Sequence, residues 1–205
     1  MIETSDKVIC LKGKKVVLRP FDIATDFDLF VKWINDPEVI RFLLRIMPAY
    51  RHHQLAWFES LPNWTDIVFT IETIPGNIIG MIGLDRINLV DGTAWTWQII
   101  GDQQNRSQGY GTDSKILLLD YAFNTLRLEK VCAEAIASNK SSLRYNEKSG
   151  FREEGRLKNQ IYREGRRHDL VLLGILKDEF PEILEQYKST ENSSELSESD
   201  YKHSI

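Results

Sequence analysis

Residues 101–123, GDQQNRSQGYGTDSKILLLDYAF, join an apolar run to a helical run through a polar turn. Two glycines, Gly109 and Gly111, stand one residue apart where the helix is expected to begin. Because glycine has no side chain, both positions let a ligand come close to the backbone. Unpaired amides and the helix dipole favour anions at such a helix start, and Arg106 adds a positive charge nearby. The turn therefore predicts a phosphate site, although a Gly-x-Gly pair before a helix is often only a turn.

Three phosphate-binding motifs compete for this turn. The P-loop needs Gly-x4-Gly-Lys-Ser/Thr, which the sequence lacks. The dinucleotide fingerprint needs a third glycine at position 114, but Ser114 stands there. It also needs an acidic residue at the end of the next parallel strand, whereas Glu129 lies at the start of the strand that follows. The third motif, Arg/Gln-x-x-Gly-x-Gly/Ala at the end of a central strand, is matched at every defined position by residues 106–111.

The pattern around the turn predicts a mixed α/β sheet. Apolar periodicity and breakers predict strands at 16–20, 66–73, 77–85, 94–100, 129–137, 157–162 and 169–176, and helices at 25–35, 38–44, 51–61, 112–126, 139–149 and 178–187. Strands outnumber the helices that could cross between them, and several are joined by hairpin turns such as Pro75-Gly76 and the turn at 163–166. A doubly wound parallel sheet is therefore not expected. We predict a single domain over residues 1–187 and a flexible, Ser- and Glu-rich tail over 188–205.

Composition narrows the class of protein. The net charge is −4, from 26 basic and 30 acidic residues, which argues against a nucleic-acid binder. The two cysteines, Cys10 and Cys132, imply no disulfide framework, and no signal peptide or membrane-spanning run is seen, so the cytoplasm is expected. The four histidines show no metal-ligand spacing, and we predict no metal site.

Residues 106–111 resemble the pyrophosphate loop of the GNAT superfamily of N-acetyltransferases, which bind acetyl-coenzyme A (acetyl-CoA). Residues 139–151, NKSSLRYNEKSGF, are similar to the second signature of that family, with Asn139, Ser142 and Tyr145 three residues apart. WINDPEV at 33–39, GFREEGR at 150–156 and HDLV at 168–171 resemble the ribosomal-protein alanine acetyltransferases (RimJ/RimL type). The match keeps its order from about residue 16 to residue 177. It implies the GNAT fold, a mostly antiparallel central sheet flanked by helices.

The resemblance implies an acetyl-CoA-dependent N-acetyltransferase in which an amine attacks the thioester directly. It places Tyr145 beside the thioester, where the hydroxyl protonates the leaving thiolate. From the residues alone, a half-buried anchor is the favoured role for Tyr145, and Asn139 fits a helix cap. The coenzyme contacts implied by the resemblance are Ile99, Ile100, Gly101, Arg106, Ser107, Gln108, Gly109, Tyr110, Gly111, Thr112, Asn139 and Ser142.

The sequence does not identify the general base that removes a proton from the amine. Many relatives carry a glutamate on the strand before the turn, but alignment backward from Arg106 places Thr96 there, and threonine cannot act as a base at neutral pH. Asp85 or Asp102 with a bridging water are the remaining candidates. The expected acceptor is a protein N-terminus or a small amine such as a polyamine, amino sugar or antibiotic, and the chain is expected to be a monomer or homodimer. The missing glutamate also leaves open a non-catalytic acyl-CoA-binding module or sensor.

Overall fold

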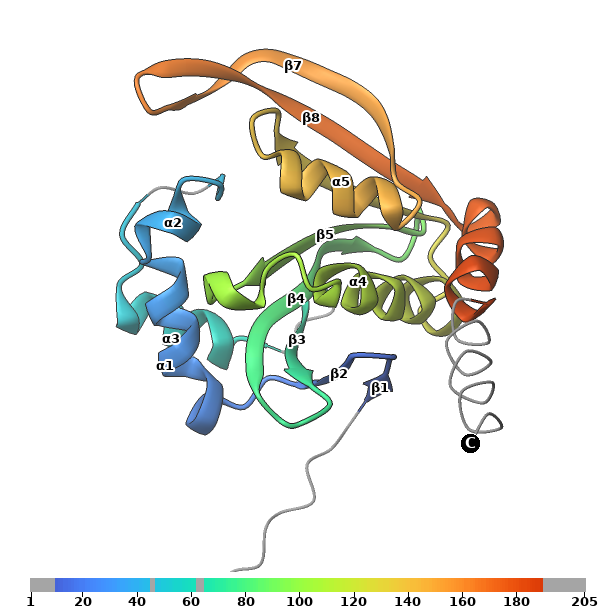
Figure 1. Cartoon of the computed structure of the whole chain (residues 1–205), viewed down its shortest axis with the longest axis horizontal. Helices are drawn as coiled ribbons and strands as arrows, with labels where there is room; N and C mark the ends of the chain where they lie inside the picture. Colours follow the sequence, from blue (N-terminus) through green and yellow to red (C-terminus); the bar gives the residue numbers. More distant parts are fainter. Residues whose placement is uncertain (1–9, 45–46, 62–64, 190–205) are drawn as a thin grey trace, which may run out of the picture.

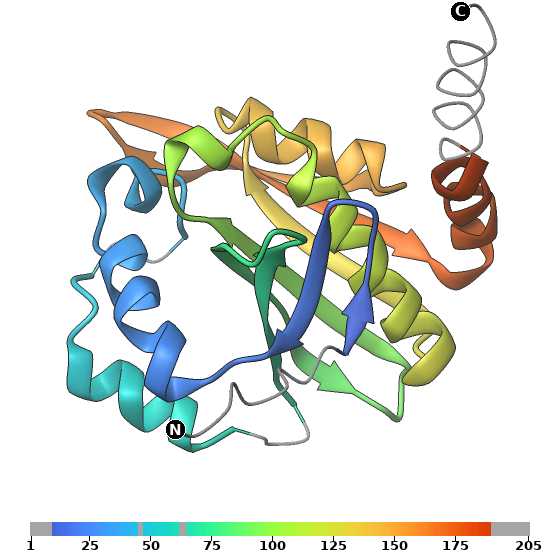
Figure 2. The same cartoon turned by 60° about the horizontal axis from the view of Figure 1, so that its bottom comes forward.

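The computed structural model describes residues 10–44, 47–61 and 65–189, which fold around one mixed sheet (Figures 1 and 2). Within these residues the strand order is β1-β2-β3-β4-β5-β6-β8-β7. Every neighbouring pair is antiparallel except β5 and β6, which are parallel. The strands are β1 (Leu11–Lys12), β2 (Val16–Pro20), β3 (Ile67–Thr73), β4 (Ile78–Asn88), β5 (Thr93–Ile100), β6 (Lys130–Ile136), β7 (Arg152–Arg163) and β8 (Arg166–Leu176). The predicted mixed, mostly antiparallel sheet is confirmed.

Helices cover both faces of the sheet. They are α1 (Ile23–Ile34), α2 (Pro37–Ile40), α3 (Arg51–Glu59), α4 (Tyr110–Asp120) and α5 (Lys140–Lys148), followed by a C-terminal helix at residues 180–189. Side chains of α1, α2 and α3 form one core with Val68, Met81 and Ile99 of the sheet. Side chains of α4 form a second core with strand residues such as Phe69 and Ile71. Because neighbouring β3 residues Val68 and Phe69 enter different cores, the strand is buried on both faces and reads as a nearly continuous apolar run.

Several predicted boundaries were wrong, each for a local reason. Helix α4 begins at Tyr110 instead of Thr112, because Gly109 already takes the left-handed conformation that starts it, and its predicted last turn is a π-helical turn over Tyr121–Thr125. The β7–β8 hairpin is longer than predicted at both strands, since two register shifts let the polar strand β7 stay paired.

The predicted tail over 188–205 also needs correction at its start. Lys188 and Ser189 still belong to the C-terminal helix, and the tail from residue 190 onward lies outside the described residues. In the described part of the chain, no helix is long and apolar enough to cross a membrane.

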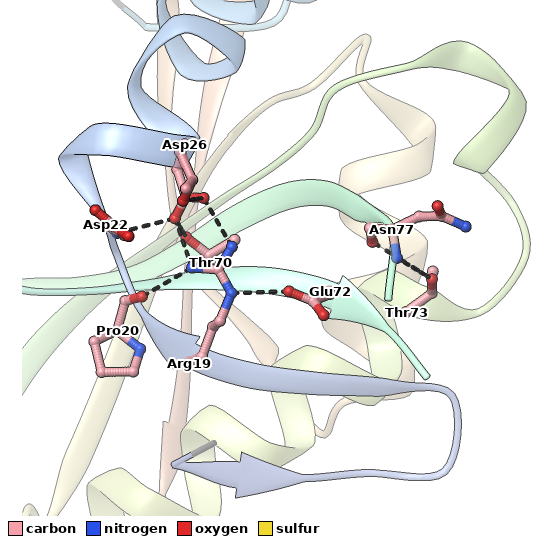
Figure 3. A network of polar contacts seen from close by, with 9 residues as sticks. Arg19, Pro20, Asp22, Asp26, Thr70, Glu72, Thr73 and Asn77 are labelled. Carbon is pink, nitrogen blue, oxygen red and sulfur yellow. Dashed lines mark hydrogen bonds and ion pairs between the residues drawn. The ribbon is translucent and has the colours of Figure 1, made fainter. Parts of the chain in front are cut away.

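A buried ionic network joins β2, β3 and α1 (Figure 3). The Arg19 guanidinium donates to both carboxylate oxygens of Asp26, each at 2.7 Å, and to Glu72 at 2.8 Å. Asp26 is fully buried and also accepts from the Thr70 hydroxyl (2.6 Å) and the Asp22 amide (3.0 Å). Burial by itself would raise the pKa of Asp26, but the hydrogen bonds, led by that from Arg19, hold it below its ordinary value. The network fixes the start of α1 on the sheet.

We expect Asp26→Asn to lower the free energy of unfolding by about 3–5 kcal/mol, because it leaves the buried Arg19 without its main counter-charge. Since the folded-state pKa of Asp26 is depressed, its contribution is present at neutral pH and is lost as pH falls through the acid range. Urea denaturation at neutral and acidic pH measures both effects. Asp28→Asn on the same helix is the control: its ion pair with Arg51 is exposed, so the change should stay within about 1 kcal/mol. Equal losses in the two variants would contradict the assigned role of Asp26.

Candidate functional site

The sheet opens between its two parallel strands. The pairing of β5 with β6 runs from Thr93 opposite Lys130 to Thr96 opposite Ala133 and then stops, although both strands continue. Among the described residues, 97–100 therefore have no strand partner on the β6 side. Backbone donors and acceptors on such an edge can bind an extended ligand as a further strand would. The predicted contact residues Ile99 and Ile100 lie on this edge.

The turn after β5 is fixed by close packing and by Arg106. A Cβ at Gly101 would lie 2.0 Å from the Trp33 ring, so only glycine fits there. The Arg106 guanidinium donates to the carbonyls of Ile100 (3.3 Å) and Gly101 (2.8 Å). Arg106 was predicted to be a charge near the ligand, and its hydrogen bonds show that it holds the turn in place.

The start of α4 presents backbone amides on one side of the loop that precedes it. In the part of the chain that the structure describes, the amides of residues 107–112 donate to no protein acceptor. Ser107 (φ +62°) and Gly109 (φ +85°) are both left-handed, which turns successive N–H groups toward one side of the loop. Gly111 has no such constraint, since a Cβ there would only touch the Gln98 side-chain amide at 3.6 Å. The loop has the form of an anion site, and Gly109 is the glycine that its backbone requires.

Lys15 adds a positive charge that the sequence analysis missed. Its Nζ donates to the carbonyl of Gln108 at 2.9 Å, beside Gly109. The Asp113 carboxylate on α4 holds Lys15 there by accepting from the backbone amides of Lys15 (2.8 Å) and Val16 (3.0 Å). Nothing in the sequence links residue 15 to residue 108, because the two meet only through the tertiary fold.

Helix α5 lies beside α4 and carries the second signature (Figure 1). The Asn139 side chain accepts from the Ser142 amide at 3.1 Å, so the predicted helix cap is confirmed. The Asn146 side chain is 1% exposed and donates to the Ser142 carbonyl, while its Oδ1 has no partner among the described residues. Burial raises the pKa of Tyr145 to about 12, against the effect of hydrogen bonds with Asn146 and Ser142.

Lys115 was also missed by the sequence analysis. Its side chain is fully buried, and its Nζ donates to Thr96 Oγ1 at 2.9 Å. The same Nζ lies 5.5 Å from the ring centres of both Tyr145 and Phe151. Burial lowers its pKa to about 7. The signal was present in the sequence: position 115 stands three and four residues before the buried Leu118 and Leu119, on the face of α4 that meets the sheet.

The two aspartates suggested as bases already have partners. Arg86 donates to Asp85 at 3.1 Å, and the Trp33 indole donates to Asp102 at 3.4 Å. They also stand near opposite ends of β5, since Asp85 pairs with Trp95 while Asp102 follows Ile100. In the described ranges no group of three or more His, Cys, Asp or Glu side chains could hold a metal ion.

Comparison with known proteins connects this geometry to one family. The family model described as the acetyltransferase (GNAT) domain matches residues 15–152. Spermidine N(1)-acetyltransferase of Vibrio cholerae is 30% identical over 55% of this chain and 64% of its own length. A Bacillus subtilis protein named for a ribosomal N-acetyltransferase is 33% identical over 51% of this chain and 57% of its own length. A crystal structure of the Vibrio cholerae spermidine N-acetyltransferase in complex with CoA and spermine superposes with a TM-score of 0.74 at 22% identity, covering 80% and 97% of the two chains.

We expect Gly109→Ala to weaken CoA binding by at least about tenfold, measured by calorimetry. The new Cβ would lie 3.2 Å from Lys15 Nζ, and alanine disfavours the left-handed conformation that the loop needs. Gly165→Ala is the matched control, because Gly165 has a similar φ of +77° in the β7–β8 turn and no neighbour within 4 Å. Both variants lose stability for the same backbone reason. Equal CoA affinity in the two would remove the loop from the binding site.

Proposed function

Because the chain belongs to the GNAT acetyltransferase family, we propose that it transfers the acetyl group of acetyl-CoA to a primary amine. The observation that carries the proposal is the row of free amides at residues 107–112, next to the open edge of β5. The amides and Lys15 suit a pyrophosphate, and the edge at residues 97–100 suits the extended pantetheine arm that follows it. These residues therefore fit the coenzyme on chemical grounds.

In this proposal the coenzyme supplies an activated acetyl thioester, and the chain's residues bind and orient it. Residues 99–101 and the turn at 106–112 hold the arm and the pyrophosphate, and Asn139 and Ser142 line the α5 side. The amine must be neutral to attack. The reference pKa is near ~8 for an α-amino group and near ~10 for a lysine-like amine, so most of either amine must lose a proton at neutral pH. The Tyr145 hydroxyl donates to the sulfur as the carbon–sulfur bond breaks.

The acceptor is an amine that enters from the face of the sheet covered by α1, α2 and α3. On this side Arg163 of the β7–β8 hairpin donates to the carbonyls of Leu43 and Leu44, so the hairpin borders the segment after α2. Exposed Met47 and Tyr50 follow in the same segment. Resemblance to the RimJ/RimL type favours a protein N-terminus, and similarity to a spermidine acetyltransferase favours a polyamine.

A second candidate function is a non-catalytic acyl-CoA-binding module. The observation that favours it is Thr96, a buried threonine where many relatives have a glutamate. A panel of polyamines, amino sugars and N-terminal peptides, tested for CoA release from acetyl-CoA, separates the two. Release with at least one amine supports the transferase, and tight CoA binding without release from any of them supports the binding module.

We expect Tyr145→Phe to lower kcat by about 10²–10⁴-fold while CoA affinity stays nearly unchanged, because the substitution removes only the hydroxyl donor. Steady-state rates with the best acceptor of the panel and calorimetry with CoA measure the two effects. Tyr121→Phe is the control, since the Tyr121 ring packs edge-on against Phe69 in the core behind α4. A normal kcat for Tyr145→Phe would leave Tyr145 as a packing residue.

A further inference from the structure

Among the described residues, no acidic side chain contacts the buried amine of Lys115. It is fully buried on α4, between the sheet and α5. Three groups face its Nζ: Thr96 from β5, the Tyr145 ring from α5, and the Phe151 ring that precedes β7. Of these only Tyr145 can titrate, and burial is the sole cause of the lowered Lys115 pKa, so no carboxylate of the described chain compensates the ammonium ion.

Such a residue lowers stability, since burying an unpaired charge is costly and a leucine or methionine would fill the same space without that cost. Its position is also specific. Thr96, which accepts its hydrogen bond, is the last residue of β5 that pairs with β6. The amine therefore lies where the sheet begins to open, next to the residue to which the transfer chemistry has been assigned.

Tyr145 needs help from a positive charge if it is to act as a proton donor. Its pKa of about 12 lies well above the ~8.5 of an ordinary thiol, so transfer of its proton to a sulfur is unfavourable in the free chain. A cation a few ångströms from the ring stabilises the phenolate that this transfer creates.

We propose that Lys115 is the ionisable partner of Tyr145 in acetyl transfer: as an ammonium ion it stabilises the negative charge that develops on the leaving sulfur and on the Tyr145 oxygen. The proposal rests on the function proposed above. The acceptor nitrogen bonds to the acetyl carbon, the carbon–sulfur bond breaks, and Tyr145 gives its proton to the sulfur. Tyr145 regains a proton from solvent, which takes up the one that the acceptor nitrogen releases. Lys115 thus acts through its charge on the sulfur and on the Tyr145 oxygen, and it transfers no proton itself.

This role predicts a pH dependence with a definite sign. Lys115 is charged below a pH of about 7 and neutral above it, so its help is lost as pH rises through that value. The acceptor amine is needed in its neutral form, so its contribution grows with pH. The kcat profile should therefore fall on its alkaline side, and Lys115→Met, which is nearly isosteric, should lower kcat and abolish that falling limb.

The decisive measurement is the pKa of the CoA thiol when bound, followed by the ultraviolet absorbance of the thiolate. A thiolate next to Lys115 would keep the ammonium ion charged above pH 7, so the two groups titrate as a pair. We expect the thiol pKa to be about one unit or more below that of free CoA with the unmodified chain, and to return to near the free value with Lys115→Met. Lys148→Met, the same change at an exposed position of α5, should behave as the unmodified chain. An unshifted thiol pKa in the unmodified chain contradicts the proposal whether or not the variant folds.

Stability provides a second readout that a packing role would not give. The folded-state pKa of Lys115 is lowered, so its cost is fully present below about pH 7 and disappears as pH rises toward 10.5. Lys115→Met should therefore raise the melting temperature at neutral and acidic pH. An unshifted thiol pKa with CoA bound, or a lower melting temperature with an unchanged rate profile, would overturn the role of Lys115. Failure of CoA to bind to the unmodified chain would overturn the proposed function instead.

Discussion

The parallel pairing of β5 with β6 is the constraint on which the rest of the structure depends. Parallel neighbours need a long crossover connection, and here the turn at 101–109 and α4 provide it. The crossover puts a helix start at the carboxyl end of β5, where open α/β sheets commonly bind ligands. Because the pairing ends at Thr96 opposite Ala133, the open strand edge and the free amides of that helix lie next to each other. The short pairing of β5 with β6 therefore determines where the open strand edge and the free amides of α4 lie.

Helix α4 connects this site to the rest of the molecule through three consecutive buried polar residues. Asp113 holds the β1–β2 turn and accepts from the Tyr187 hydroxyl of the C-terminal helix at 2.6 Å. Ser114 donates to the Tyr110 carbonyl and accepts from Gln98 of β5. Lys115 reaches Thr96 on the same strand. An ordinary amphipathic helix would bury apolar side chains at such positions, whereas these polar contacts tie the start of α4 to the β1–β2 turn and to β5.

Most of the fold and the glycine turn at the start of α4 could be predicted from local pattern. Gly109, the Asn139 cap and the order of strands and helices depend on residues near one another in the sequence. The partners of Lys15 and Lys115 could not be predicted in this way, because only the tertiary fold brings them close. Apolar periodicity also fails to predict the first residue of α4, because polar residues occupy buried positions in its first turns. The base candidates Asp85 and Asp102 were chosen by residue type, and the structure gives each another partner.

Two buried cations in this chain show how structural and functional charges can be told apart. Arg19 is surrounded by Asp26 and Glu72, and the hydrogen bonds that raise its pKa further keep it charged. Lys115 has a hydroxyl and two rings, and burial moves its pKa into the range where it can gain or lose a proton at neutral pH. A charge whose partners are complete can only hold the fold together. A charge without an anionic partner weakens the fold and can stabilise negative charge that arises during a reaction, and Lys115 lies beside the tyrosine where that charge is expected to develop.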